Sequence, residues 1–328
     1  MTLIGQALST LEQTAALSEH FQVTGCTNLQ YKPTIAVSTQ AKASKANGTS
    51  LTVHIAFPHP GPQSGNQSGE ANIARVHVEL PKSLPARLTT LQKACTEKQF
   101  ASNPAGCPAE SVVGHAKAIT PILPVPLEGP AYFVSHGGAA FPELIMVLQG
   151  YGVTIQLNGE TFINGKTNVT SSTFAHVPDA PVESFELTLP QGAYSALGAY
   201  LPNSPNGSMC GQKLVMPTEM IAQNGAELHQ NTPIAVTGCP PSVSIVKTAV
   251  KGNSVAVTVK VGETGMVMIT GRGLKATTKR GLKAGTHTIT VPLTQAGRAA
   301  KRHGSKLKIK AALTVAGRTG TTTTTLRA

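Results

Sequence analysis

The sequence predicts an all-β protein, mainly antiparallel, with one short helical insertion and a C-terminal immunoglobulin-like β-sandwich. Three observations carry this prediction. Apolar and polar residues alternate in many short stretches, Gly (32) and Pro (23) are plentiful, and only 13% of the 328 residues are charged. The low charge and the 40% hydrophobic content exclude an intrinsically disordered chain. They also argue against coiled coils and helix bundles, which are rich in Glu and Lys.

Residues 1–26 are expected to be the tail of a preceding, similar domain or a disordered segment. The run Phe21–Cys26 resembles Ile234–Cys239, which closes a domain later in the chain. The first twenty residues contain no Lys or Arg and no apolar core long enough for a signal peptide. We therefore expect an export signal, and the partner of Cys26, to lie upstream of Met1. Sequencing of the upstream region tests this expectation, which an in-frame stop directly before Met1 would contradict.

Residues 27–242 are expected to form one disulfide-bearing β domain. Alternation with a period of two residues marks four strands, at residues 51–57, 76–80, 153–157 and 185–189. The run Leu144–Leu148 is apolar throughout, as is typical of a strand that is buried on both faces. Three of the Asn-Gly pairs in this domain are interpreted as turns: Asn158-Gly159, Asn164-Gly165 and Asn224-Gly225.

One segment of this domain departs from the two-residue period. A helical spacing relates four of its residues: Leu84, Leu88, Leu91 and Cys95. Because Pro85 suits a first helical turn, we expect a helix over residues 85–100 that packs its leucines on a sheet. The proline-rich run at residues 121–126 is expected to be an extended edge connection rather than a ligand for a proline-reading groove.

The five cysteines indicate the compartment. Cys95 and Cys107 flank a turn-forming loop, and Cys210 and Cys239 lie at the open end of a predicted hairpin, so two disulfides are expected. The first would stabilise the fold by roughly 3 kcal/mol in the chain-entropy model. No Cys-x-x-Cys pair occurs and no His lies at zinc-site spacing, so no structural metal is expected. Disulfides favour an extracellular or cell-envelope location, whereas five buried thiols in a cytoplasmic protein are the alternative.

A boundary between domains is expected at Pro240-Pro241, because two prolines end a strand and stiffen a linker. Residues 243–328 alternate almost continuously, with apolar faces at residues 255–261, 289–293 and 307–315. Short strands at regular spacing predict the immunoglobulin-like sandwich. This module contains no aromatic residue and no Cys, so the prediction concerns its architecture alone.

Positive charge is concentrated in the same module. The formal net charge is +12, to which residues 243–328 contribute +15 and residues 1–242 contribute −3, because the module holds a single acid, Glu263. The run Arg272–Ala276 recurs as Arg280–Ala284. Eleven cations are the candidate residues for binding an anionic polymer: Arg272, Lys275, Lys279, Arg280, Lys283, Arg298, Lys301, Arg302, Lys306, Lys308 and Lys310. The plainer interpretation is that these charges keep a strand-rich surface soluble.

The expected partners of the basic module are anionic cell-wall polymers or lipid headgroups. Sequence-specific binding of nucleic acid is not expected, because the module offers no aromatic residues for base stacking and no helix or finger for base readout. No stretch approaches the ~20 apolar residues that a membrane helix requires, so no transmembrane segment is expected.

No catalytic, cofactor-binding or metal site is expected, and the protein is expected not to be an enzyme. The chain has neither a Gly-x-Ser-x-Gly nor a His-Glu-x-x-His motif. The run Gly165–Thr167 is similar to the end of a phosphate loop, but Glu160 stands where the first glycine is needed. His136 is expected to be a surface residue in a turn. Glu183 and Glu186 would lie on opposite faces of a strand, which argues against paired catalytic carboxylates.

Several longer runs carry a family resemblance. Leu84–Cys95 is followed by Asn103–Pro108, and further along the chain come Gly129–Gly138 and Ser184–Pro190. Together these runs resemble a family of uncharacterised, exported, β-rich surface proteins of soil actinobacteria. The similarity extends over roughly residues 21–239, with a looser likeness in the basic module. No reaction is established for this family, so the resemblance implies a cell-envelope location.

The preferred function is therefore non-catalytic. We expect an envelope-associated structural or adhesion protein whose basic module binds anionic wall polymers. The alternative is a secreted carbohydrate-binding module or hydrolase acting through the first domain, with Tyr194, Tyr200 and Phe185 as the place to look for exposed aromatic rings. A third interpretation, nucleic-acid binding in the cytoplasm, requires that the cysteines be reduced.

Overall fold

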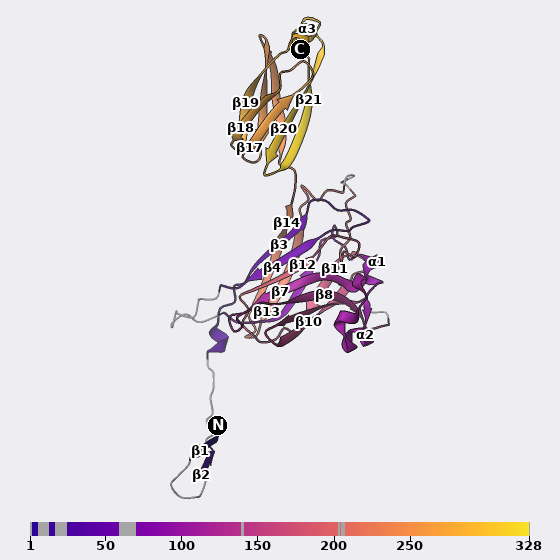
Figure 1. The fold of residues 1–328 in the computed structure, drawn as a ribbon, viewed down its shortest axis with the longest axis vertical. Helices are drawn as coiled ribbons and strands as arrows, with labels where there is room; N and C mark the ends of the chain where they lie inside the picture. The colour runs from indigo at the N-terminus through magenta and orange to yellow at the C-terminus, as the bar shows by residue number, and fades with distance from the viewer. Residues whose placement is uncertain are drawn as a thin grey trace. The chain divides into compact units, whose positions relative to one another are not determined.

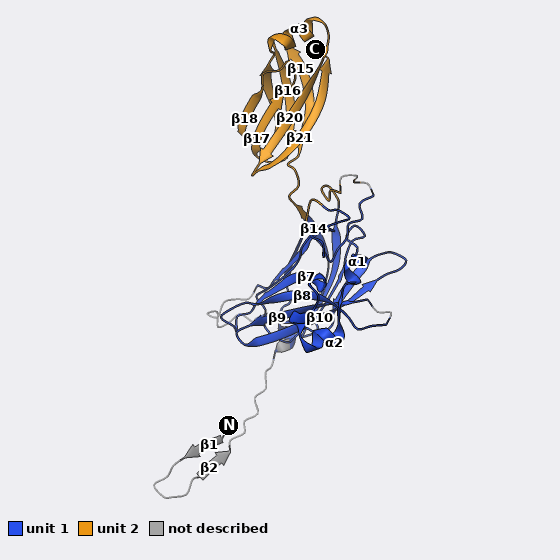
Figure 2. Ribbon diagram, turned by 45° about the vertical axis from the view of Figure 1, so that its right-hand side comes forward, with its two compact units in different colours: residues 1–39, 43–203, 213–235 blue, residues 40–42, 204–212, 236–328 orange. Residues whose placement is uncertain are grey.

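The computed structural model describes residues 2–5, 13–16, 25–58, 70–138, 141–202, 204 and 207–327. The fold is all-β with mainly antiparallel strands, as the sequence predicts. The chain divides into two compact units, each assembled from three segments (Figure 2). Unit 1 comprises residues 1–39, 43–203 and 213–235, and unit 2 comprises residues 40–42, 204–212 and 236–328.

The predicted tail at residues 1–26 lies mostly outside the described residues. Within it, β1 (Thr2–Gly5) pairs with β2 (Gln13–Ala16) in antiparallel register. Residues 21–24 of the repeat and the side chain of Cys26 fall outside the part of the chain that the structure describes. The origin of this segment therefore stays a prediction.

Unit 1 is built on one large sheet (Figure 1). Its strands in chain order are β3 (Thr34–Gln40), β4 (Leu51–Ala56), β5 (Ile73–Glu79), β6 (Cys95–Thr96), β7 (Val112–Ile119), β8 (Leu127–Ser135), β9 (Glu143–Gly150), β10 (Val153–Ile163), β11 (Thr170–Phe174), β12 (Ser184–Leu189), β13 (Val215–Ala222) and β14 (Glu227–Thr237). Their spatial order is β6-β8-β7-β12-β4-β3-β14-β13-β5-β11-β10-β9.

The sheet of unit 1 closes on itself. Strand β9, at the end of that order, also pairs with β8, from Glu128 opposite Gln149 to Val134 opposite Glu143. All strands except β6 therefore form a ring, and β6 is added to β8 in parallel register. Because side chains alternate along a strand, every second residue of the ring points into an enclosed interior.

The apolar run Leu144–Leu148 lies in β9 and is buried on both faces, which confirms the prediction for it. Met146 and Leu148 point into the ring, where they line its interior. Ile145 and Val147 point outward and pack in a cluster with Tyr132. A second layer of structure outside the ring therefore covers this strand.

The turn predicted at Asn158-Gly159 is wrong. Strand β10 continues through both residues, and the hairpin with β9 turns earlier, at Tyr151-Gly152, where both residues have positive φ (51° and 77°). The physical reason is that β10 changes partners at Gly159. It pairs with β9 as far as Gly159 and with β11 from Glu160 onward. A Cβ atom at Gly159 would lie 2.5 Å from the ring of Phe174, so glycine is required by close approach rather than by a turn.

The two other Asn-Gly turns are confirmed. Asn164 follows β10, and its side-chain oxygen accepts hydrogen bonds from the backbone N–H groups of Lys166 (3.0 Å) and Thr167 (3.1 Å). This is the local bonding that suits Asn to turns. Gly225 has a φ of 82° and joins β13 to β14 in an antiparallel hairpin.

The single helix predicted over residues 85–100 is wrong. Two short helices, α1 (Leu88–Leu91) and α2 (Glu97–Ser102), take its place, with strand β6 between them. Leu91 is buried, whereas Leu88 is 60% exposed. The break occurs because Cys95 and Thr96 extend to pair with Val134 and the residue after it in β8. Tertiary pairing thus overrides the helical spacing of the leucines.

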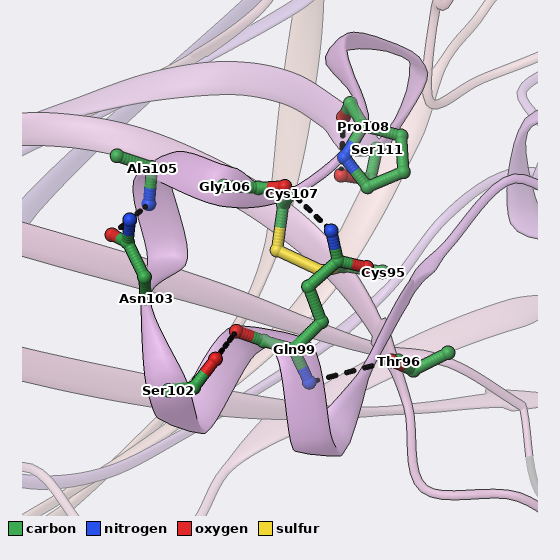
Figure 3. Close-up of a disulfide and its surroundings, with 10 residues drawn as sticks. All are labelled: Cys95, Thr96, Gln99, Ser102, Asn103, Ala105, Gly106, Cys107, Pro108 and Ser111. Carbon is green, nitrogen blue, oxygen red and sulfur yellow. Dashed lines mark hydrogen bonds between the residues drawn. A yellow bond between two sulfur atoms is a disulfide. The ribbon is translucent and has the colours of Figure 1, made fainter.

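The predicted disulfide Cys95–Cys107 is present, with a Cα–Cα distance of 5.4 Å (Figure 3). It closes a loop that contains α2. Thr96 caps this helix by accepting a hydrogen bond from the N–H of Gln99, whose side-chain amide donates to the carbonyl of Gly106 at 2.6 Å (Figure 3). Phe100 of α2 packs edge-on against Tyr132, with ring centroids 5.5 Å apart. The loop therefore seals the outer face of β9.

Unit 2 contains two antiparallel sheets (Figure 1). One has the order β15-β16-β19 and the other β18-β17-β20-β21. The strands are β15 (Val243–Lys251), β16 (Ser254–Val261), β17 (Gly265–Thr270), β18 (Thr277–Leu282), β19 (Gly285–Pro292), β20 (Lys306–Val315) and β21 (Arg318–Arg327), and helix α3 (Gln295–Arg302) lies between β19 and β20.

The core of unit 2 comes from both sheets. Val255, Val257 and Val259 of β16 are fully buried against Ile309 and Leu313 of β20 in one cluster. These apolar positions alternate along the sequence as predicted, so their strands are confirmed. Helix α3 is not expected from the alternation. It forms because Thr294 caps its first turn through the N–H of Gly297 (3.3 Å).

The three segments of unit 2 are joined to one another near residues 236–239. The predicted disulfide Cys210–Cys239 is present, with a Cα–Cα distance of 5.7 Å. The N–H of Ala41 donates to the carbonyl of Thr237 at 2.7 Å, and the N–H of Met209 donates to the carbonyl of Ala41 at the same distance. Pro240-Pro241 therefore lies within unit 2, a few residues beyond the division after Ala235.

Candidate functional site

All eleven candidate cations of the basic module are solvent-exposed. The structure separates them into three groups. Six lie at the end of the sandwich that carries α3: Arg272, Lys275, Arg298, Lys301, Arg302 and Lys306. Two continue along β20, namely Lys308 and Lys310. Three lie on β18 and the turn after it: Lys279, Arg280 and Lys283.

Helix α3 and the loop before β18 assemble the first group. Gly271 at the end of β17 approaches the backbone of Lys308, which places Arg272 beside the start of β20. The N–H of Lys275 donates to the carbonyl of Pro292 at 2.8 Å, at the end of β19. Lys301 donates to the carbonyl of Gly252 at 2.8 Å. These contacts bring the loops at one end of the sandwich together.

Two further cations, which are not among the eleven predicted candidates, join this end. Lys251 is the last residue of β15 and precedes Gly252, and Arg327 pairs with Lys306 across β20 and β21. We call the eight cations together the basic end: Lys251, Arg272, Lys275, Arg298, Lys301, Arg302, Lys306 and Arg327. The two additions could not be found by spacing along the chain, because the fold alone gathers these strand ends.

Not every cation of the basic end is free to meet a ligand. The guanidinium of Arg298 donates to the carbonyl of Leu293 at 3.0 Å, within the turn that leads into α3. Lys301 is held by Gly252, as described above. Lys301 and Arg302 also lie in the last turn of α3, where positive charge stabilises the helix dipole. Part of the positive charge therefore supports the local structure.

Lys306, Lys308 and Lys310 form a row on the outer face of β20. Their neighbours Leu307 and Ile309 are buried in the core, as the alternation predicts. Opposite this row, β21 presents Thr325 and Thr323 to Lys308 and Lys310. The row thus extends the basic end along an otherwise hydroxyl-rich, uncharged surface.

The two copies of the repeated sequence have different structures. In the first, Leu274 is buried and Gly273 has a φ of 85°, where a Cβ atom would meet Gly297 of α3 at 2.9 Å. In the second, Arg280 lies in β18 and Gly281 follows it in the same strand. The repeat therefore does not make two equivalent binding loops.

Negative charge is almost absent from this surface. Glu263, the single acid of residues 243–328, is 2.9 Å from the guanidinium of Arg318. Both lie at the opposite end of the sandwich, beside the start of β17 and the start of β21. No acidic side chain of the described residues 243–327 lies among the cations of the basic end, so they produce a positive field, which attracts polyanions and weakens as salt screens it.

The histidine and carboxylate groups of unit 1 form local pairs rather than a metal site in the described part of the chain. His136 is bound on both sides, by Glu97 of α2 and Glu143 of β9, with N–O distances of 3.2 Å. It thus links α2 to the ring from the residue that follows β8, and its side chain stays partly exposed. Among the described residues no group of three or more His, Cys, Asp or Glu side chains is arranged to hold a metal.

Shifted pKa values do not converge on one site. Burial raises the pKa of the Tyr31 phenol, and the negative charge of Glu70 raises it further. Burial also raises the pKa of Tyr132. These two residues belong to separate core clusters. A hydrogen bond to Glu227 raises the pKa of the exposed His229. Perturbed groups that share a cleft are the usual sign of a catalytic centre, and these do not share one.

The aromatic residues suggested for sugar binding are not gathered together. Tyr194 and Tyr200 are exposed and follow the end of β12. Phe185 lies at the other end of the same strand and points into the ring.

The described part of the chain also has no helix that is long and apolar enough to cross a bilayer.

Comparisons with known proteins do not assign the chain to a family. No protein-family model matches the chain, and no curated protein matches it. Among solved structures, a red sea bream transglutaminase is similar over 90% of this chain, with 10% identity and a TM-score of 0.20, and this chain covers 31% of the length of that protein. A DUF4785 family protein from Legionella pneumophila is similar over 95% of this chain and 98% of its own, with 9% identity and a TM-score of 0.18.

Proposed function

We propose that the protein is a non-catalytic, envelope-associated structural or adhesion protein, which attaches to anionic cell-wall polymers through the basic end of unit 2. The observation that carries the proposal is the concentration of eight exposed cations at one end of a module whose single acid is paired elsewhere. Two disulfides, Cys95–Cys107 and Cys210–Cys239, indicate an oxidising compartment, and an extracellular or envelope location is part of the proposal.

A polymer is favoured over a small anion by the shape of the charged surface. The cations extend from the loops around α3 along the outer row Lys306–Lys310, rather than converging on a pocket. A flexible chain of repeated negative charges can follow such a row, and each contact releases counterions. Lipid headgroups carry the same charge, and the experiment below separates the two sources.

We also propose that unit 2 is of the immunoglobulin type. Its first, second and fifth strands form one sheet, and its third, sixth and seventh strands lie in the other, as in immunoglobulin folds. Its fourth strand, β18, pairs with β17, whereas constant-type immunoglobulin domains keep the fourth strand in the first sheet. Modules of this kind are widespread in cell-surface proteins.

Co-sedimentation of the full chain with purified bacterial cell walls, across a salt series, tests the proposal. We expect binding at low salt and release as salt rises. Changing Lys306→Gln and Lys308→Gln together should lower the release concentration and reduce the slope of log affinity against log salt by roughly one to two units. The matched control is Lys247→Gln with Lys260→Gln, which removes the same charge from exposed positions on the other sheet.

Three outcomes would overturn the proposal. Walls stripped of their anionic polymers could retain the protein as well as untreated walls do. The two double variants could weaken binding equally, which would indicate a general charge effect. Anionic phospholipid vesicles could bind the chain more tightly than walls do at the same salt concentration, which would assign the basic end to lipid headgroups instead.

A further inference from the structure

An apolar cavity of about 220 Å³ lies inside the ring of unit 1. Its wall includes inward-facing side chains from β3, β4, β5 and from β7 through β13. Among the residues that the structure describes, all that line the cavity are apolar except Thr120 and Thr218, and none of them is charged. The cavity belongs to a different unit from the basic end and plays no part in the function proposed above.

Both hydroxyl groups of the wall make hydrogen bonds within the protein. Thr218 donates to the carbonyl of Met216 at 3.0 Å and lies 3.2 Å from the hydroxyl of Thr232. Thr120 accepts the N–H of Ile122 at 3.4 Å. A buried water needs two to four polar partners, so this wall offers water no stable position. An apolar occupant suits the cavity better than water does.

The interior of unit 1 is incompletely packed, as a comparison with unit 2 makes plain. In unit 2, the inward-facing residues Val255, Val257 and Val259 are fully buried. In unit 1, Val53, Val76 and Val78 also face the interior, yet they remain only half-buried. Close packing is the rule inside proteins, so apolar side chains that line unfilled space indicate room for a ligand.

As far as the described residues show, the cavity opens at one end of the ring and is closed at the other. At the open end, Ile122 in the loop between β7 and β8 lines the cavity and is 64% exposed, and Val153 at the start of β10 is 37% exposed. At the closed end, Leu84 and Leu197 are buried beneath the segments that Arg87 holds together. A ligand would therefore enter from the end that Ile122 and Val153 border.

We propose that unit 1 binds the aliphatic chain of a lipid in this cavity, with the polar headgroup outside at the open end. The lining is mostly branched aliphatic, with the adaptable side chains of Met146 and Met216 and two aromatic rings, Phe174 and Phe185. No charge inside the cavity could pair with a headgroup. The volume exceeds the roughly 150 Å³ of an apolar protein cavity that takes up benzene.

Competition between a fluorescent fatty acid and saturated fatty acids from octanoate to palmitate, on the full chain and below their micelle concentrations, tests the proposal. We expect one site per chain. Affinity should rise about fourfold with each added methylene until the cavity is full and then level off. Affinity that keeps rising over the whole series, or that falls as the chain lengthens, would contradict enclosure of the acyl chain. Failure of every fatty acid to displace the probe would overturn the proposal.

Two exposed aliphatic residues provide matched variants. Ile122→Asp places a charge at the opening and should weaken binding of palmitate at least about tenfold. Leu88→Asp makes the same kind of change at a residue of similar exposure (60%) on α1, outside the cavity, and should leave affinity unchanged. Equal weakening by both variants would contradict the proposed opening.

A cavity-filling variant tests the volume. Ala118 faces the cavity from β7, so Ala118→Phe should move the plateau to shorter fatty acids. If this variant fails to fold, the pair at Ile122 and Leu88 still decides the outcome, because both residues are exposed. A rigid polycyclic sterol that displaces the probe as well as palmitate does would overturn the assignment of an aliphatic chain.

Discussion

Arg87 is the residue on which three segments of unit 1 depend. Its guanidinium donates to the carbonyls of Gly192 (3.1 Å), Ala193 (2.7 Å) and Ala46 (2.7 Å), and its backbone N–H donates to the carbonyl of Ala196. The planar guanidinium has five donors in a fixed arrangement, so one side chain can satisfy carbonyls from separate loops. The closed end of the ring is held in this way.

Arg87→Lys should lower the free energy of unfolding of unit 1 by about 2 kcal/mol, because a single ammonium cannot reach all three carbonyls. Urea unfolding followed by tyrosine fluorescence measures this. All five tyrosines belong to unit 1, so the signal reports that unit alone: Tyr31, Tyr132, Tyr151, Tyr194 and Tyr200. As a control, Arg75→Lys alters an exposed pair with Glu219 at 3.8 Å and should change stability by less than about 1 kcal/mol. Equal losses would refute the role of Arg87.

At the level of the element, each disulfide supports a different unit. Cys95–Cys107 encloses α2 in unit 1, whereas Cys210–Cys239 ties residues 204–212 to the start of unit 2. Helix α2 has six residues, too few to be stable by itself. Its position on the outer face of β9 therefore depends on the bridge and on Phe100.

Replacing Cys95 and Cys107 by Ser should destabilise unit 1 by roughly 3 kcal/mol and should speed hydrogen exchange of the α2 amides. The matched variant replaces Cys210 and Cys239 by Ser. It should leave the unfolding transition seen by tyrosine fluorescence nearly unchanged, since that bridge belongs to unit 2. A large shift of the tyrosine signal in the second variant would show that the bridges do not act unit by unit.

The elements that could be predicted are those whose signal is local. Alternation identifies β4, β16 and β20, the apolar run identifies β9, and sequence spacing pairs the four bridged cysteines. The break between α1 and α2 and the passage of β10 through Gly159 could not be predicted. Both arise from pairing with distant strands, which leaves no local mark.

The candidate sites also divide into parts with a local sequence signal and parts that only the fold brings together. Alternation along β20 marks the row Lys306–Lys310, but Lys251 and Arg327 join the basic end only through the fold. The cavity of unit 1 could not be predicted, because inward-facing Val and Ile residues alternate in the same way around a filled core and around a hollow one.

Across the whole molecule, the positive charge is concentrated in unit 2. Residues 243–328 carry +15 in 86 residues, and self-repulsion of this size opposes compactness. The remaining residues are close to neutral, at −3. The stability of unit 2 should therefore depend on ionic strength much more than the stability of unit 1 does.

Calorimetry of the full chain should resolve two transitions, of which one moves to higher temperature as NaCl is added, because salt screens the repulsion. Tyrosine fluorescence in the same buffers assigns the transitions, since residues 243–328 contain no aromatic residue. We expect the tyrosine transition to be the one that salt leaves nearly unchanged. A larger salt dependence of the tyrosine transition would contradict this assignment.

The closure of the ring also bears on how the chain acquires its structure. β3, near the beginning of unit 1, pairs with β14, near its end. A ribosome delivers the chain from the amino terminus, so the ring cannot close before β14 has been synthesised. Until then the valines and isoleucines destined for the interior remain uncovered. Late, long-range pairing of this kind slows folding, and apolar segments that stay uncovered in the meantime are prone to aggregate.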